Sequence, residues 1–354
     1  MYALIKVANI LLTVGLTIFF LSYCPAKIKE DANTWLILIY RPSLNPITYV
    51  LLANVIASLF TLLMLFKWLV PKKWTFNFPL WKEMIIYALP MLVAGIGWTI
   101  NETFDRLMLG WWLPHENNFA DEQRGIYSAC YKLSILISLF IQAFRMGAEP
   151  FFFKQASGEN AQRTYARVMK FFVITITLMF LVVSLYIPIW KYFISPKEWE
   201  GLGVVPILLL ANMSLGIYIN LSIWYKVTNN TMAGAWITLA GTSITILVNW
   251  IFIPRYSYFA CAWATFLCYT TMMILSFTWG QKKYYIPYAW KKLLAYIAIV
   301  VVLYFVQRLI SNLWDNIIFN LSIATILTAS YCWFILQVEK KEFRQLPVIG
   351  KYLK

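Results

Sequence analysis

Long runs of apolar residues alternate with short polar connections along the whole chain. Each run is about 20 residues long, the length that an α-helix needs to cross a hydrocarbon core of roughly 30 Å. The runs are continuous, whereas strands of a membrane barrel are about ten residues long and alternate apolar with polar positions. The pattern predicts an all-α, polytopic membrane bundle. Ten spans are expected, near residues 4–23, 47–69, 84–110, 126–148, 168–190, 203–225, 233–253, 259–280, 292–309 and 316–336.

Composition excludes a soluble globular protein. Of the 354 residues, 61% are hydrophobic and only 13% are charged, and the mean hydropathy is +0.66. The connections are too short for a soluble domain or for the large external loop of a polysaccharide polymerase. The one histidine, His115, falls in a short connection rather than in a span. We therefore expect no metal, no cofactor and no enzyme activity.

Lysine and arginine gather in every second connection between spans. Because these residues accumulate on the cytoplasmic side of membrane proteins, the pattern predicts that both termini are cytoplasmic. The same bias, helped by anionic membrane lipid, explains the formal net charge of +15 without a nucleic-acid partner.

Charged residues are concentrated in the third and fourth spans. Charges at membrane depth are costly, so they usually mark a path for a substrate or an ion. The alternative is that they only hold two neighbouring helices in register. The six charged residues are Glu102, Asp105, Arg106, Lys132, Arg145 and Glu149.

Two further features favour a cavity in this hairpin. Pro90, Gly95 and Gly97 interrupt the third span, and such residues bend membrane helices where neighbours or water satisfy the freed backbone. The fourth span carries a polar stripe at helical spacing that includes Gln142. Estimated depths predict that Lys132 pairs with Asp105 or Glu102. They also place Arg145 beside Glu149, near the cytoplasmic mouth.

Polar residues elsewhere are expected to have structural roles. Thr238, Thr242, Thr245 and Asn249 share one face of the seventh span, and this spacing favours hydrogen bonds between helices. Residues 151–172 are basic and amphipathic, and we expect them to form a connector along the membrane surface.

The strings ALPMLVAGIGWTINETFDRLMLGWWL and GIYSACYKLSILISLFIQAFRMGAEPFFFKQ give the sequence a family resemblance. Over residues 80–170 the chain resembles the O-antigen-type polysaccharide flippases of the multidrug/oligosaccharidyl-lipid/polysaccharide exporter superfamily. The resemblance implies movement of a polyprenyl-diphosphate-linked oligosaccharide across the bacterial inner membrane. It also implies that a glycan polymerase and glycosyltransferases act beside the chain.

Members of that superfamily usually have twelve or fourteen spans in two six-helix lobes. By this resemblance, residues 1–70 correspond to the end of the N-terminal lobe, residues 80–280 to a complete C-terminal lobe, and residues 290–354 to two terminal spans with a basic tail. Four N-terminal helices would then be missing, so a truncated flippase that does not function alone is one alternative. A multidrug or small-metabolite exporter is another.

The chemistry of the implied substrate assigns roles to the charged cluster. Arg145, Lys132, Arg106 and Gln142 are the candidates for contacting the diphosphate and lining the cavity. Arg145 is preferred, because a guanidinium group matches phosphate oxygens bidentately. Glu102, Asp105 and Glu149 are expected either to carry a coupling ion or to form structural charge pairs.

Overall fold

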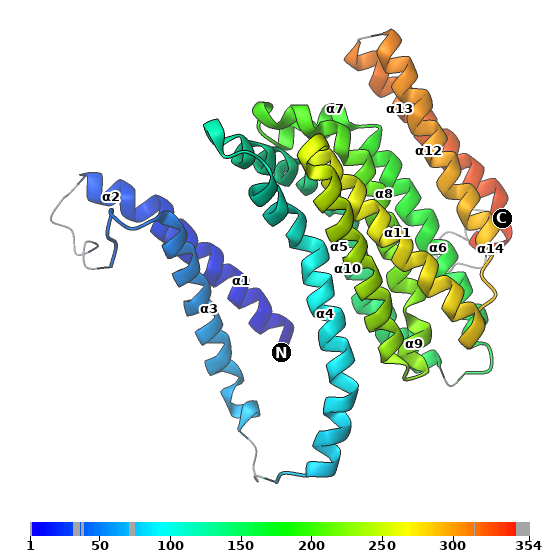
Figure 1. Ribbon diagram of the computed structural model, residues 1–354, viewed down its shortest axis with the longest axis horizontal. Coiled ribbons are helices and arrows are strands. Elements are labelled where there is room, and N and C mark those ends of the chain that lie inside the picture. Colours follow the sequence, from blue (N-terminus) through cyan, green and yellow to red (C-terminus); the bar gives the residue numbers. More distant parts are fainter. Residues whose placement is uncertain are drawn as a thin grey trace. The chain divides into compact units, whose positions relative to one another are not determined.

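The computed structural model describes residues 2–30, 36, 39–70, 75–156, 158–314 and 316–344. These ranges contain helices and no strand. Within them, ten helical segments are long and apolar enough to cross a membrane. The prediction of an all-α, multi-pass membrane protein is confirmed (Figure 1). The chain divides into two compact units, Met1–Trp81 and Lys82–Lys354. The division into parts of two lobes stays a prediction.

The first unit is built on a pair of long helices. They are α1 (Tyr2–Ile18), which continues through a π-turn (Phe19–Tyr23) into α2 (Cys24–Glu30), and α3 (Pro46–Leu69). A polar contact joins the pair: Asn9 Nδ2 donates to Ala57 O at 2.8 Å and to Thr61 Oγ1 at 2.9 Å. Such amide contacts hold helices together where water is absent.

The second unit contains the remaining spans. Its helices are α4 (Phe78–Trp112), which starts at the end of the first unit, α5 (Phe119–Gln155), α6 (Ala161–Ser184), α7 (Ile187–Trp190), α8 (Val205–Leu221), α9 (Ile223–Val227), α10 (Thr231–Tyr256), α11 (Tyr258–Lys283), α12 (Trp290–Leu313), α13 (Ile317–Val338) and α14 (Lys340–Phe343). Short 3₁₀ turns lie at Glu116–Asn118, Lys191–Phe193 and Pro196–Val204.

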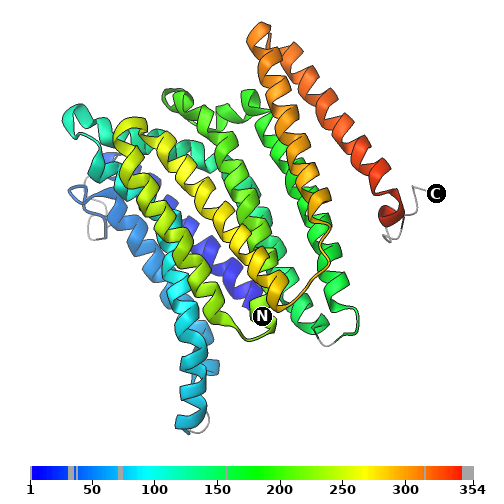
Figure 2. The same cartoon turned by 45° about the vertical axis from the view of Figure 1, so that its right-hand side comes forward.

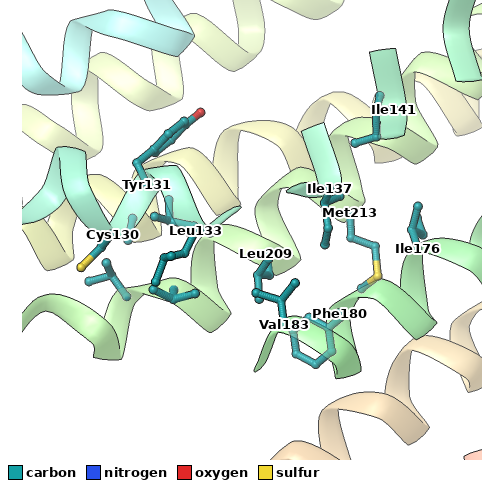
Figure 3. Packing of buried hydrophobic residues seen from close by; sticks show 14 of the residues in the cluster. Cys130, Tyr131, Leu133, Ile137, Ile141, Ile176, Phe180, Val183, Leu209 and Met213 are labelled. Atoms are coloured by element: carbon teal, nitrogen blue, oxygen red, sulfur yellow. The ribbon is translucent and has the colours of Figure 1, made fainter. Parts of the chain in front are cut away.

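Helix α8 forms the centre of this unit and packs against α5, α6 and α11. Figure 3 shows the apolar side chains of α5, α6 and α8 that meet there, among them Ile137, Phe180 and Met213. Gly216 permits the close approach, because an added Cβ would come within 2.8 Å of Phe172 Cζ and 3.0 Å of Ile141 Cδ1. The sixth predicted span is therefore a buried helix, and its few polar side chains, such as Asn212 and Asn220, are buried with it.

The C-terminal hairpin, α12 and α13, packs against α6 (Figure 2). Gln307 Nε2 donates to Leu185 O at 3.0 Å, and the hydroxyls of Thr177 and Tyr331 are 2.7 Å apart. These bonds satisfy polar groups that would otherwise face hydrocarbon.

One expectation about the connections between spans needs correction. Residues 151–172 are not a separate surface connector, because α5 continues through Pro150 to Gln155 and α6 begins at Ala161. Helix α4 is continuous through Pro90, Gly95 and Gly97. A bend without a break at these residues stays a prediction.

Candidate functional site

The halves of α4 and α5 that adjoin the Glu116–Asn118 turn hold a buried carboxylate. They are called the outer halves after the predicted orientation, and the opposite halves are called the inner halves. Asp105 is only 1% exposed. Its Oδ2 accepts a hydrogen bond from the Tyr127 hydroxyl at 2.6 Å, and its Oδ1 accepts one from the Arg106 amide at 2.8 Å. Both oxygens therefore have partners within the protein, as a buried charge requires.

Glu102 lies one turn away and also receives hydroxyl donors. Tyr131 donates to Oε2 at 2.9 Å and Tyr269, from α11, donates to Oε1 at 2.7 Å. The guanidinium carbon of Arg106 lies 4.5 Å from the centre of the Tyr131 ring, a distance typical of cation–π contacts. Its Nη1 donates to the Glu102 carbonyl at 3.3 Å.

The predicted pairing of Lys132 with Asp105 or Glu102 is wrong. The face of α5 that meets α4 is occupied by Tyr127 and Tyr131, four residues apart. Lys132 is rotated about 100° from Tyr131 around the helix, and its side chain is exposed. Tyrosine hydroxyls take the place that the sequence analysis gave to lysine.

Below Glu102, a polar cavity opens between α4, α5 and α8. One compartment has a volume of about 500 Å³, and its polar lining comes from Glu102, Ser138, Gln142, Arg145 and Glu149. Most of these are the polar stripe of α5. From Ser138 to Glu149 the stripe is about 16 Å long at 1.5 Å per residue.

A second compartment of about 470 Å³ continues the cavity. The two share Trp98, Arg145, Glu149 and Ile219, so they form a single hollow, here called the polar cavity. The second compartment adds residues from α4, α5, α8, α9 and α10. Its further lining includes Tyr87, Gly95, Phe153, Tyr218, Tyr225, Lys226, Thr231 and Thr238.

The two compartments meet at a group of three charges. Glu149 Oε1 accepts from Arg145 Nε at 3.0 Å and from Lys226 Nζ at 2.5 Å. All three side chains are partly exposed to the polar cavity. One carboxylate oxygen therefore lies between two cations, in the position that a bound anion would take.

Lys226 is a residue that the sequence analysis missed. It follows Tyr225 at the end of the sixth apolar run, so the sequence does show a positive charge at the edge of that span. Only the fold, however, brings α9 against the inner end of α5.

The predicted site residues fall into two groups. Arg145, Gln142, Glu102, Glu149 and Gly95 line the polar cavity. The others lie outside its lining: Arg106, Lys132, Asp105, Pro90 and Gly97. The structure brings Arg145 beside Glu149 as expected, while the roles of these residues stay predictions.

Gly97 has a packing role instead. A Cβ there would come within 2.8 Å of Thr238 Cγ2, so glycine lets α4 approach α10 closely. Thr242 donates to the Gly97 carbonyl at 3.3 Å and Thr245 donates to Asn101 at 3.1 Å. The predicted hydrogen bonding between helices is confirmed for these two threonines. Thr238 instead bonds Gly234 of its own helix.

Comparisons with known proteins add an identification of the fold. Residues 32–156 match the family described as "Polysaccharide biosynthesis protein". The structure is similar to that of the lipid II flippase MurJ in its inward closed conformation, with a TM-score of 0.55 and 14% identity, over 92% of this chain and 67% of that chain. No curated protein matches the sequence. The two matches confirm the resemblance found in the sequence, the family match over residues 32–156 and the structural match in the fold alone.

Proposed function

We propose that this chain, a transporter that matches the polysaccharide biosynthesis family and shares its fold with a lipid flippase, moves a polyprenyl-diphosphate-linked oligosaccharide across the bacterial inner membrane. The glycan would serve surface polysaccharide or O-antigen assembly. The observation that carries the proposal is the polar cavity with Arg145 and Lys226 converging on one carboxylate oxygen. Charged side chains are common on the surface of a soluble protein. Within a membrane bundle each charge is costly and needs a partner of opposite charge or a polar surrounding.

The diphosphate is the part of this substrate that most needs protein partners. Arg145 offers a planar fork of donors and Lys226 a point charge, and both suit phosphate oxygens. In the structure Glu149 occupies the position between them. We propose that the diphosphate displaces Glu149 and that Gln142, about one turn before Arg145 on α5, donates a hydrogen bond to the substrate.

The sugars need hydroxyl partners and flat apolar surfaces. Trp98, Tyr218 and Tyr225 line the polar cavity beside the charged group. Aromatic rings with polar edges suit amphipathic ligands such as sugars. The polyprenyl tail needs no polar path, because it can remain in the lipid.

Glu102 and Asp105 have different roles in this proposal. Glu102 lines the polar cavity and can be reached by a coupling proton or cation. Asp105 is sealed by Tyr127 and the backbone of Arg106, so it holds α4 and α5 together. The coupling role therefore belongs to Glu102 alone.

A multidrug or small-metabolite exporter is the second candidate. It is favoured by one observation: Glu102 and Glu149 balance the charges of Arg145 and Lys226 in the polar cavity. A cavity without net charge and rich in aromatic rings also suits a cationic amphiphile.

Orientation and partners follow from the same proposal. The lysine-rich connections place both termini in the cytoplasm, and a membrane-embedded glycan polymerase and glycosyltransferases would supply and consume the substrate. Arg145 and Lys226 lie toward the ends of α5 and α9 that face this side, which suits loading from the cytoplasmic leaflet.

A complementation experiment tests the proposal. A strain that lacks this chain would receive the wild type, Arg145→Ala, Lys226→Ala or, as a control, Lys154→Ala, an exposed lysine outside the polar cavity. We expect the wild type and the control to clear accumulated lipid-linked oligosaccharide, and the two cavity variants to export at least about tenfold less, as loss of a charged hydrogen bond would give. Normal export by both cavity variants would contradict the proposal. Dye efflux without glycan export would favour the exporter.

A further inference from the structure

A second polar site shares no lining residue with the polar cavity and lies where α6 meets the C-terminal hairpin. It is a cavity of about 330 Å³. Its lining comes from α6, from the α11–α12 connection and from α14: Arg163, Ala166, Arg167, Lys170, Pro287, Ala289 and Glu342. The three cations share one face of the first turns of α6, and this cavity is called the basic pocket below.

The cations around the basic pocket exceed the carboxylates. Lys170 Nζ is 3.0 Å from oxygens of both Glu339 and Glu342, and Arg167 Nε is 2.8 Å from Glu342. Lys292 adds a further contact to Glu339 at 2.6 Å. Two carboxylates thus meet three cations before Arg163 is counted.

Arg163 is the cation left over. Its side chain is exposed, and among the described residues it forms no ion pair. Counting Arg163, Arg167, Lys170 and Lys292 against Glu339 and Glu342 gives 4 − 2 = +2. An anion of one or two charges would balance this excess.

An apolar hollow flanks the same connection. Its lining is entirely apolar and comes from α6, α8, α11 and α12, with Met169, Leu221, Phe277 and Leu293 among its members. Residues 287–290, which run from the connection into the start of α12, alternate between the two sites: Pro287 and Ala289 line the basic pocket, whereas Tyr288 and Trp290 line the hollow. Charged and apolar binding surfaces are therefore adjacent at one end of the bundle.

We propose that the basic pocket binds the headgroup of an anionic phospholipid, whose phosphodiester contacts Arg163 and Arg167 while an acyl chain enters the apolar hollow. The position of the pocket along the membrane helices fits this ligand. The pocket lies at the ends of α6, α12 and α13, where lipid headgroups meet the hydrocarbon. Basic pockets between membrane helices bind acidic headgroups in this way. The bound lipid holds the C-terminal hairpin against α6. The proposal does not depend on the proposed function of the polar cavity.

Native mass spectrometry of the purified full chain tests this inference. The protein would be stripped of lipid and then offered phosphatidylglycerol or phosphatidylcholine. We expect the wild type to retain phosphatidylglycerol at least about fivefold more than phosphatidylcholine, and Arg163→Gln to remove most of that preference. Arg163 is exposed, so this variant should fold. Lys154→Gln, which removes an exposed lysine outside the pocket, should behave as wild type.

Three outcomes would overturn the inference. They are no preference for phosphatidylglycerol in the wild type, the same preference in Arg163→Gln, or displacement of the lipid by a short-chain polyprenyl diphosphate, which would assign the pocket to the transported substrate. Failure of the proposed function would instead appear as unchanged glycan export in both Arg145→Ala and Lys226→Ala, and it would leave the lipid result unchanged.

Discussion

The outer and inner halves of the α4–α5 hairpin contain the same kinds of side chain and use them differently. In the outer half, Asp105 has tyrosine and backbone donors on both oxygens, is buried, and lies outside the lining of the polar cavity. In the inner half, Arg145 and Glu149 are partly exposed and line the polar cavity. An intramembrane charge whose partners are all internal serves the fold, whereas one that faces a cavity is available to a ligand. Exposure to a cavity, rather than charge itself, separates the two roles.

The largest effect on stability is expected from the outer half. Asp105→Asn replaces a buried carboxylate that accepts two hydrogen bonds and that lies beside Arg106. We expect a loss of about 1–3 kcal/mol in the free energy of unfolding, the usual consequence of leaving a buried polar group unsatisfied. Thermal unfolding in detergent measures it. Export per folded molecule should remain normal. Loss of export at normal stability would show that Asp105 acts in transport, as proposed for the residues of the inner half.

Acidification tests, at the C-terminal hairpin, whether charged side chains with partners inside the protein stabilise the fold. Hydrogen bonds from Lys170 lower the pKa of Glu342. Burial alone would raise the pKa of Glu339, but hydrogen bonds from Lys292, Tyr296 and Lys170 outweigh it and lower the pKa. A carboxylate with a lowered pKa adds stability above its unfolded pKa of about 4.3, and this contribution is lost as the pH falls through the folded value.

We therefore expect the melting temperature to fall on acidification below about pH 5. Glu339→Gln should flatten this dependence. A control, Glu116→Gln, removes an exposed acid of the Glu116–Asn118 turn and should leave the dependence unchanged. A pH profile that is identical in wild type and Glu339→Gln would show that these ion pairs contribute nothing.

A smaller effect is expected when the inner carboxylate is neutralised. Glu149→Gln removes the internal competitor for Arg145 and Lys226, so the affinity for a polyprenyl diphosphate should rise by up to about fivefold, the equivalent of one partly exposed ion pair. Equilibrium binding to the purified protein measures this. A fall in affinity would mean that Glu149 positions the cations rather than competing with the ligand.

The smallest effect is expected at Lys132, although the sequence suggested a central role. Its exposed side chain lies outside the polar cavity, so Lys132→Gln should change stability by less than about 0.5 kcal/mol, as at other surface positions. Export should also be unchanged. A strong transport defect in Lys132→Gln would indicate that Lys132 contributes to the substrate site. It would contradict the conclusion that this side chain acts outside the polar cavity.

The sequence predicted the helical class and the location of all ten spans, because run length and continuity are local properties. It underestimated the lengths of α4 and α5, since polar turns continue a helix beyond its apolar part. It placed Arg145 beside Glu149 because an i,i+4 spacing is also local.

Contacts between distant segments could not be predicted from the sequence. Tyr269 binds Glu102 from α11, and Lys226 binds Glu149 from the end of the sixth span. No periodicity along α4 or α5 identifies these partners. The assignment of Lys132 as a partner failed for a related reason: depth along a helix was estimated, but the direction of the side chain was not.

Binding of a short-chain polyprenyl diphosphate to the purified chain tests the central claim most directly. The variants would be Arg145→Gln and Lys226→Gln in the inner half, with Lys132→Gln and Asp105→Asn as comparisons. We predict that each inner variant loses about tenfold or more in affinity while the other two bind as wild type. Equal binding by all four, or a larger loss in Lys132→Gln than in Lys226→Gln, would contradict the assignment of the polar cavity as the substrate site.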